Sequence, residues 1–184
     1  MRSSSGAWIA LAAVACAAPP PAVAPASHAT GPGLGTPVSA DAIAARDIDA
    51  DAWGAGLPPG SGSAREGKDL YASQCARCHG LAGDDGPADA LVTREGGAPR
   101  LTVGNYWPYA PTLFDYLRRA MPYDRPGSLD NDALYALTAY LLAENGIVAD
   151  DAVLDQETLP QVVMPGRARF PDPAPAAHPD AAAR

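Results

Sequence analysis

The sequence Cys-Ala-Arg-Cys-His at positions 75–79 constrains the fold of this 184-residue chain more than any other feature. Two cysteines at C-x-x-C spacing can each form a thioether with a vinyl group of haem, and the histidine that follows can bind the iron. The motif therefore predicts one covalently bound haem c, with Cys75 and Cys78 as its anchors and His79 as the proximal iron ligand.

Two other uses of paired cysteines fit the chain less well. A structural zinc site needs a second Cys or His pair at ligand spacing, and the chain has only one further cysteine and two isolated histidines, His28 and His178. A thioredoxin-like redox centre would follow a strand of a βαβ unit, and no strand pattern precedes Cys75.

Composition limits both the core and the partners of the chain. Most of the 20 Pro and 18 Gly lie outside the middle of the sequence, and the formal net charge is -8. No basic stripe is available to neutralise phosphates, which excludes general nucleic-acid binding. Lys68 is the only lysine, so the chain cannot dock through a ring of lysines. A small middle section makes only a thin core, which a covalently held porphyrin would enlarge.

The N-terminus has the pattern of an export signal. Arg2 precedes an apolar stretch at 6–18 that is too short to span a bilayer comfortably. We therefore expect residues 1–18 to be a signal peptide and the protein to be periplasmic, because haem is attached to C-x-x-C-H outside the bacterial cytoplasm. A loose lipobox around Cys16 leaves open a lipoprotein signal, with membrane attachment only if Cys16 is lipidated.

The remaining segments differ clearly in composition. Residues 19–36 are rich in Pro, Ala and Gly and are predicted to be a disordered spacer, and residues 37–62 an extended arm with a short helix at 41–46. Residues 63–146 form the predicted haem-binding domain. The Pro-rich residues 147–173 are expected to run extended over that domain, and residues 174–184 to be disordered.

Two capped helices frame the predicted domain. Ser63 and Glu66 form a capping box that begins a helix running into Cys75. Asp130 is the N-cap of the last helix, whose predicted stripe is Leu134, Leu137 and Leu141 and which ends at Gly146.

Between them, residues 112–120 are predicted to form a short amphipathic helix. No strand is predicted. The helix has an apolar face of Leu113, Phe114 and Leu117 and a solvated face of Asp115, Arg118 and Arg119.

The sixth iron ligand must come from a second segment. A thioether is a soft ligand that favours ferrous iron, and two methionines besides the initiator offer one. Met121 is preferred because the loop after the short helix can fold across the porphyrin face opposite His79. Met164, in the Pro-rich tail, is the alternative. His28 and His178 lie in segments expected to be disordered, which argues against a second histidine ligand.

An aromatic stretch precedes the helix that leads to Met121. The ring N–H and O–H groups of Tyr106 and Trp107, together with Arg100, are candidates for binding the haem propionates. Packing of amphipathic rings explains the same aromatic residues equally well.

Taken in order, these features resemble class I cytochrome c. The resemblance covers residues 63–146: a capped helix with Gly67, C-x-x-C-H-G, Met121-Pro122 and a final helix containing Ala-Tyr-Leu. It implies an all-α fold, with the first and last helices crossed around one haem, and it implies ligation by His79 and Met121.

Further motifs flank and fill the domain. They are GLPPGSG at 56–62, TVGNYWPYA at 102–110, TLFDY at 112–116, YALTAY at 135–140, NGIV at 145–148, and Leu159-Pro160 leading to Met164-Pro165. Together they resemble the cytochrome subunit of sulfane dehydrogenase of the Sox sulfur-oxidation system and single-haem sulfite dehydrogenase cytochromes. This resemblance runs from about residue 37 to 173, and the chain lacks the second C-x-x-C-H of some relatives.

The resemblance implies that a molybdenum-cofactor subunit oxidises a sulfur compound and passes electrons to this chain. The chain would hand them to a downstream cytochrome or oxidase and would perform no substrate chemistry of its own. The alternatives are a free periplasmic shuttle to a terminal oxidase, a catalytic haem with an open iron site, and a lipid-anchored structural protein.

Overall fold

Helices α2 (Ala64–Gln74) and α6 (Asn131–Glu144) cross at Gly67. A Cβ atom at this position would collide with the carbonyl oxygen of Ala136, so only glycine permits the close approach of the two backbones. One turn further along α2, the ring of Tyr71 packs on that of Tyr140, with 5.1 Å between ring centroids. The two helices that the sequence places at the ends of the domain therefore meet, as predicted.

The structure is a computed structural model that describes residues 35–94 and 100–171. The chain divides into two units, residues 1–39 and 40–184, and every described helix and strand belongs to the second. The predicted signal peptide, most of the spacer, the final segment at 174–184, Cys16, His28 and His178 lie outside the described residues.

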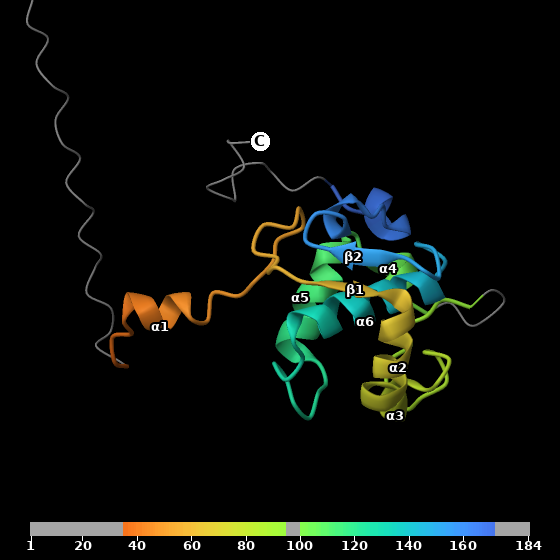
Figure 1. Ribbon diagram of the computed structural model, residues 1–184, viewed down its shortest axis with the longest axis horizontal. Coiled ribbons are helices and arrows are strands. Elements are labelled where there is room, and N and C mark those ends of the chain that lie inside the picture. The colour runs from red at the N-terminus through yellow and green to blue at the C-terminus, as the bar shows by residue number, and fades with distance from the viewer. Residues whose placement is uncertain (1–34, 95–99, 172–184) are drawn as a thin grey trace, which may run out of the picture. The chain divides into compact units, whose positions relative to one another are not determined.

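Short helices and two small strands complete the fold (Figure 1). Six α-helices occur in the described part of the chain, which confirms the predicted all-α class. None of them is both long and apolar enough to cross a membrane. Besides α2 and α6 the elements are α1 (Ala40–Ala44), β1 (Ser61–Ser63), α3 (Ala76–His79), α4 (Val103–Tyr106), α5 (Ala110–Ala120), β2 (Val153–Asp155) and the 3-10 helices η1 (Leu159–Gln161) and η2 (Pro165–Arg169).

The predicted caps hold in the structure. The hydroxyl of Ser63 accepts a hydrogen bond from the backbone N–H of Glu66 (3.2 Å), and the Glu66 carboxylate accepts one from the backbone N–H of Ser63 (2.8 Å). At α6, the Asp130 carboxylate accepts a hydrogen bond from the N–H of Ala133 (2.8 Å). Gly146, with φ +67, follows the end of α6. Local interactions thus set where both helices begin.

Helix α6 is the centre of the core. The sequence predicts an apolar stripe on one face, but every residue from 134 to 142 is buried. The reason is that α6 is covered on several sides, by α2, by α5 and by the two strands. Even Thr138 is fully buried, and its hydroxyl donates to the carbonyl of Leu134 within the same helix (2.7 Å).

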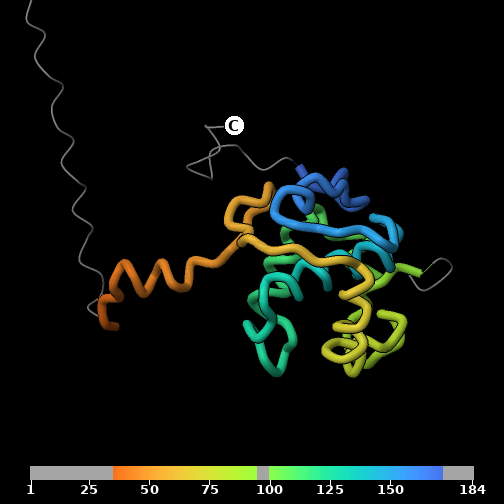
Figure 2. The backbone as a smooth tube through the Cα atoms, in the orientation of Figure 1, coloured from red at the N-terminus to blue at the C-terminus, as the bar shows by residue number. Residues whose placement is uncertain are grey.

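Strands β1 and β2 form an antiparallel pair that the sequence analysis does not predict. Gly62 pairs with Leu154, so the arm before α2 and the tail after α6 run side by side (Figure 2). β1 reads Ser-Gly-Ser and β2 reads Val-Leu-Asp, and strands of three residues are too short to show an alternating pattern, which explains the omission. Helix α4 was likewise missed, within the aromatic stretch, and α5 begins two residues earlier than predicted.

The prediction that Asp115 is solvated is wrong. Its side chain is buried, accepts a hydrogen bond from the backbone N–H of Ala50 (3.0 Å) and forms an ion pair with Arg119. Arg118, also predicted to be solvated, is half-buried and donates to the carbonyl of Ile48 (2.7 Å). The polar face of α5 is therefore the face on which the N-terminal arm packs.

The sequence analysis predicts that the tail after α6 runs extended. This prediction is wrong in part, because the tail includes the 3-10 helices η1 and η2. Proline excludes an α-helix interior yet fits the first turn of a short helix. Leu159 and Met164 from this segment are buried in the core. The tail is thus part of the packed structure.

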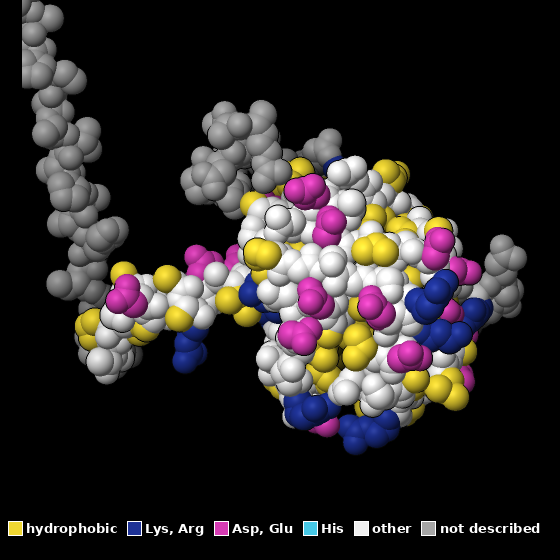
Figure 3. Space-filling model, viewed as in Figure 1, with side chains coloured by type: hydrophobic (Ala, Val, Ile, Leu, Met, Phe, Trp, Pro, Cys, Tyr) yellow, Lys and Arg dark blue, Asp and Glu magenta, His cyan; other side chains and the backbone are white. Residues whose placement is uncertain are grey.

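Acidic side chains are spread over the face drawn in Figure 3, and the Lys and Arg side chains gather in separate groups near its edge. This distribution agrees with the formal net charge of -8.

Candidate haem site

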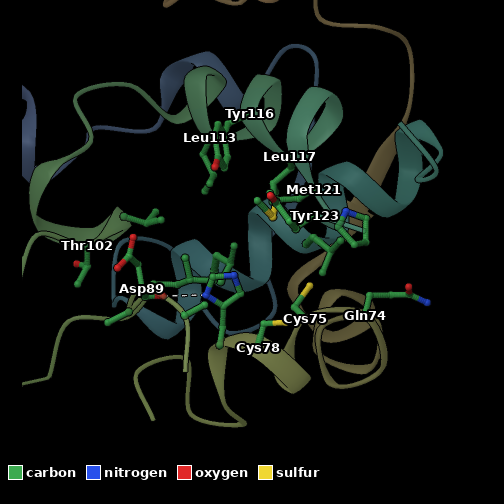
Figure 4. A pocket seen from close by; sticks show the side chains of 18 of the residues that line it. Gln74, Cys75, Cys78, Asp89, Thr102, Leu113, Tyr116, Leu117, Met121 and Tyr123 are labelled. Carbon is green, nitrogen blue, oxygen red and sulfur yellow. Dashed lines mark hydrogen bonds between the residues drawn. The ribbon is translucent and has the colours of Figure 1, made fainter. Parts of the chain in front are cut away.

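Helix α3 presents the three motif side chains together. Cys75 lies between α2 and α3, its N–H bonded to the carbonyl of Tyr71 (2.9 Å), and the N–H of His79 bonds back to the carbonyl of Cys75 (3.0 Å). Positions i, i+3 and i+4 share one face of a helical turn, so Cys75, Cys78 and His79 point the same way. Figure 4 shows both sulfur atoms directed toward one cavity.

The cavity has a volume of about 480 Å³, within the range typical of sites for small organic ligands. Cys75, Cys78 and His79 line one wall, and Met121, at the end of α5, lines another (Figure 4). The rest is mostly apolar and includes Leu91, Val103, Trp107, Leu113, Leu117, Leu137 and Leu141.

The imidazole of His79 has a backbone partner. Its Nδ1 atom lies 2.8 Å from the carbonyl oxygen of Asp89. An N–H at Nδ1 that donates to this carbonyl leaves the lone pair of Nε2 available for a metal. The neighbouring residue Ala88 donates its N–H to the carbonyl of Cys78 (2.8 Å), which ties the acceptor segment to the motif.

The two motif thiols are not joined in a disulfide. Burial, followed by the neighbouring Cys78, raises the pKa of Cys75 to about 11. Reactive cysteines of redox centres have a lowered pKa, because the thiolate is their nucleophile. The environment of Cys75 therefore differs from that of a thioredoxin-like centre.

The two candidate methionines occupy different environments. Met121 follows α5, is half-buried and lines the cavity. Met164 is 2% exposed, belongs to the core and is not among the residues that line the cavity. The structure thus brings Met121, and not Met164, to the cavity that the motif residues line.

Of the three predicted propionate contacts, Trp107 lines the cavity and the other two do not. Tyr106 packs edge-on against Phe170, with 5.4 Å between ring centroids. The guanidinium of Arg100 reaches the carbonyl of Asp84 at 3.5 Å.

Sequence reasoning missed several cavity residues. Asp89 lies in a Gly- and Asp-rich stretch without periodicity, and its role depends on a backbone atom that no side-chain pattern reveals. Thr102 is buried at the cavity, with its hydroxyl bonded to that of Thr93. A sequence signal for the position of Thr102 was available. Thr102 and Asn105 have the spacing of a capping box, which marks Thr102 as the N-cap of α4.

Comparisons with known proteins agree with this geometry. Residues 62–141 match the family model of cytochrome c oxidase, cbb3-type, subunit III. The crystal structure of the sulfane dehydrogenase SoxCD from Paracoccus pantotrophus matches with 38% sequence identity and a TM-score of 0.65, covering 79% of this chain and 74% of that chain. The chain belongs to the c-type cytochromes. No curated protein sequence matches this cytochrome significantly.

Membership in this family implies haem c and electron transfer rather than catalysis, and the donor set of the cavity fits haem c. The likeness to SoxCD also extends beyond the haem domain. It covers 79% of the 184 residues, or about 145, whereas the family model covers residues 62–141 alone. Part of the arm or tail of this cytochrome therefore has a counterpart in that structure.

Proposed function

We propose that this cytochrome carries a single haem, held by thioethers to Cys75 and Cys78, with His79 and Met121 as iron ligands. One observation carries the proposal: four side chains of the required chemistry, from two separate segments, line one mostly apolar cavity. The haem would supply a one-electron iron couple. Met121 is a soft donor that favours ferrous iron, and leucines such as Leu113 and Leu117 keep water from the site.

We further propose that the cytochrome accepts electrons as a subunit of a periplasmic molybdenum dehydrogenase that oxidises a sulfur compound. The likeness to a sulfane dehydrogenase at 38% identity, over more than the haem domain, supports this role. The flanking motifs and the export-signal pattern of residues 1–18 support it as well. Electrons would leave through the haem edge beside the exposed Cys78 toward a downstream cytochrome or oxidase.

The haem proposal is tested by producing the full chain in a host that attaches haem c and recording its absorption spectrum. We expect a low-spin haem that stays bound after denaturation and shows the Met–iron charge-transfer band in the ferric state. Met121→Ala is expected to abolish this band and Met164→Ala to retain it. A five-coordinate wild-type haem would instead favour a catalytic site with an open iron position.

The partner proposal needs a separate experiment. The tagged cytochrome is produced together with the molybdenum-cofactor subunit of a sulfane dehydrogenase, and the molybdenum and haem contents of the purified material are measured. Equal amounts of both are expected. A cytochrome that elutes only as a monomer without molybdenum, yet reduces a terminal oxidase, would favour the free shuttle.

A further inference from the structure

A buried tyrosine connects α2 to the residue that follows the haem motif. Tyr71 lies one helical turn before Cys75, and its side chain is 2% exposed. Its hydroxyl donates to the carbonyl oxygen of Gly80 at 2.9 Å. The ring packs on Tyr140 of α6, which fixes the position from which the hydroxyl reaches Gly80.

Gly80 begins a loop that closes on itself. Its φ is +81, and a Cβ atom there would collide with the Asp85 carboxylate, so the position requires glycine. The N–H of Gly83 approaches the Gly80 carbonyl at 3.4 Å. The Gly83 carbonyl in turn accepts the N–H groups of Leu91 (2.7 Å) and Val92 (3.2 Å). The loop from 80 to 92 is thus held at both ends.

This loop carries the carbonyl that orients the candidate iron ligand. Asp89 presents its backbone oxygen to Nδ1 of His79, and Ala88 anchors the same stretch to Cys78. The Tyr71 hydroxyl therefore binds the first residue of this loop, Gly80, and a later residue of the same loop, Asp89, orients the imidazole ring of His79.

Apolar packing alone does not explain a tyrosine at this position. Phenylalanine would fill the same space against Tyr140, and a buried hydroxyl is stable only when it is hydrogen-bonded. Burial raises the pKa of Tyr71 well above its ordinary value, so the group remains a neutral donor.

We propose that Tyr71 is a positioning residue for His79, acting through the Gly80 carbonyl and the loop that carries the Asp89 carbonyl. This inference rests on the proposed role of His79 as an iron ligand. A firm hydrogen bond at Nδ1 makes an imidazole a stronger donor to the metal, which stabilises ferric over ferrous iron. Loss of the Tyr71 hydroxyl loosens the loop, weakens that hydrogen bond and raises the reduction potential.

The test compares Tyr71→Phe with Tyr135→Phe in the haem-loaded full chain. Tyr135 is a matched control, because it is equally buried in the same core and its hydroxyl also donates to a backbone carbonyl, that of Pro58 (2.8 Å). Both variants lose one partly buried hydrogen bond from a tyrosine hydroxyl to a backbone carbonyl, but of the two tyrosines only Tyr71 is connected to the loop after the motif. The readouts are the reduction potential and the NMR signal of the His79 Nδ1 proton.

We expect Tyr71→Phe to favour the ferrous state about threefold, a rise of about 28 mV at 59 mV per factor of ten for a one-electron couple. The Nδ1 proton signal should shift in Tyr71→Phe, and Tyr135→Phe should leave both readouts unchanged. If Tyr71→Phe does not accumulate, 3-fluorotyrosine at position 71, a stronger hydroxyl donor, is expected to lower the potential.

Equal shifts in the two variants, or no shift at position 71, would overturn the positioning role while leaving the proposed haem ligation intact. A wild-type spectrum that lacks histidine ligation would overturn both proposals.

Discussion

The Nδ1 atom of His79 lies 2.8 Å from the backbone carbonyl oxygen of Asp89, so a main-chain atom orients this imidazole. The Asp89 side chain is exposed to solvent at the edge of the cavity. We therefore expect Asp89→Ala to keep the ligation of the haem-loaded protein, with an unchanged low-spin absorption spectrum. Loss of the Met–iron band in this variant would show that the carboxylate, and not the carbonyl, controls the site. His79→Ala, which removes the ligand itself, is the positive control.

Met164 is expected to stabilise the fold without touching the haem. It is 2% exposed within the core, and truncation of a buried methionine typically costs about 2–5 kcal/mol in the free energy of unfolding. Met164→Ala should therefore lower the urea midpoint while keeping the Met–iron band. Val163→Ala, at an 82% exposed neighbour, is the matched control and should change neither quantity. A lost band in Met164→Ala would reassign the sixth ligand.

Gly67→Ala is expected to destabilise the crossing of α2 and α6. The added Cβ would collide with the carbonyl of Ala136, and forced overpacking of this kind typically costs about 1–3 kcal/mol or more. Chemical denaturation of the haem-loaded protein measures the effect. Lys68→Ala, the next residue on the exposed side of α2, should lie close to the wild type. Equal stability of Gly67→Ala and the wild type would mean that the two helices can separate without loss.

Asp155 is expected to make stability depend on pH. Hydrogen bonds from the backbone N–H (2.8 Å) and hydroxyl (2.9 Å) of Thr158, and then from the N–H of Glu157 (2.9 Å), lower the pKa of this carboxyl. A carboxyl whose pKa is lower in the folded than in the unfolded state stabilises the fold at pH values above its unfolded-state pKa, which is near 3.9. This stabilisation is lost as the pH falls through the folded-state pKa. Asp155→Asn should therefore reduce the loss of stability in acid.

Denaturation midpoints measured from about pH 7 down to about pH 2 test this expectation. Thr158→Val removes the hydroxyl donor and keeps the backbone N–H, so it should remove only part of the dependence. Identical pH profiles for Asp155→Asn and the wild type would contradict the assignment.

Tyr123 is expected to influence the encounter with a redox partner. It lines the cavity yet is 87% exposed, and the neighbouring Asp124 pairs with Arg77 at 3.2 Å. These two rim charges cancel locally. Tyr123→Glu adds an uncompensated charge at the rim and should change the rate of electron transfer about tenfold at low salt, with a smaller change at high salt. Stopped-flow kinetics with the partner measures the rate, and Tyr123→Phe is the neutral control.

Local chemistry made part of this structure predictable. The capping box of Ser63 and Glu66, the Asp130 cap and the helical spacing of Cys75, Cys78 and His79 all depend on residues within one turn of each other. Such interactions are readable without a partner segment. The resemblance to c-type cytochromes followed from the same motif and was confirmed by the family match over residues 62–141.

The amino-acid sequence by itself determined the haem motif, the helices that frame it and the two methionines that could face it. The sequence favoured Met121 of the two, but only the tertiary structure places each side chain, because burial of Met164 and exposure of Met121 to the cavity depend on how the tail and α5 pack. The same holds for the buried Asp115 and for the Asp89 carbonyl at His79. Each of these features depends on a contact with a segment distant along the chain or on a main-chain atom. Local residue patterns predict neither kind of interaction.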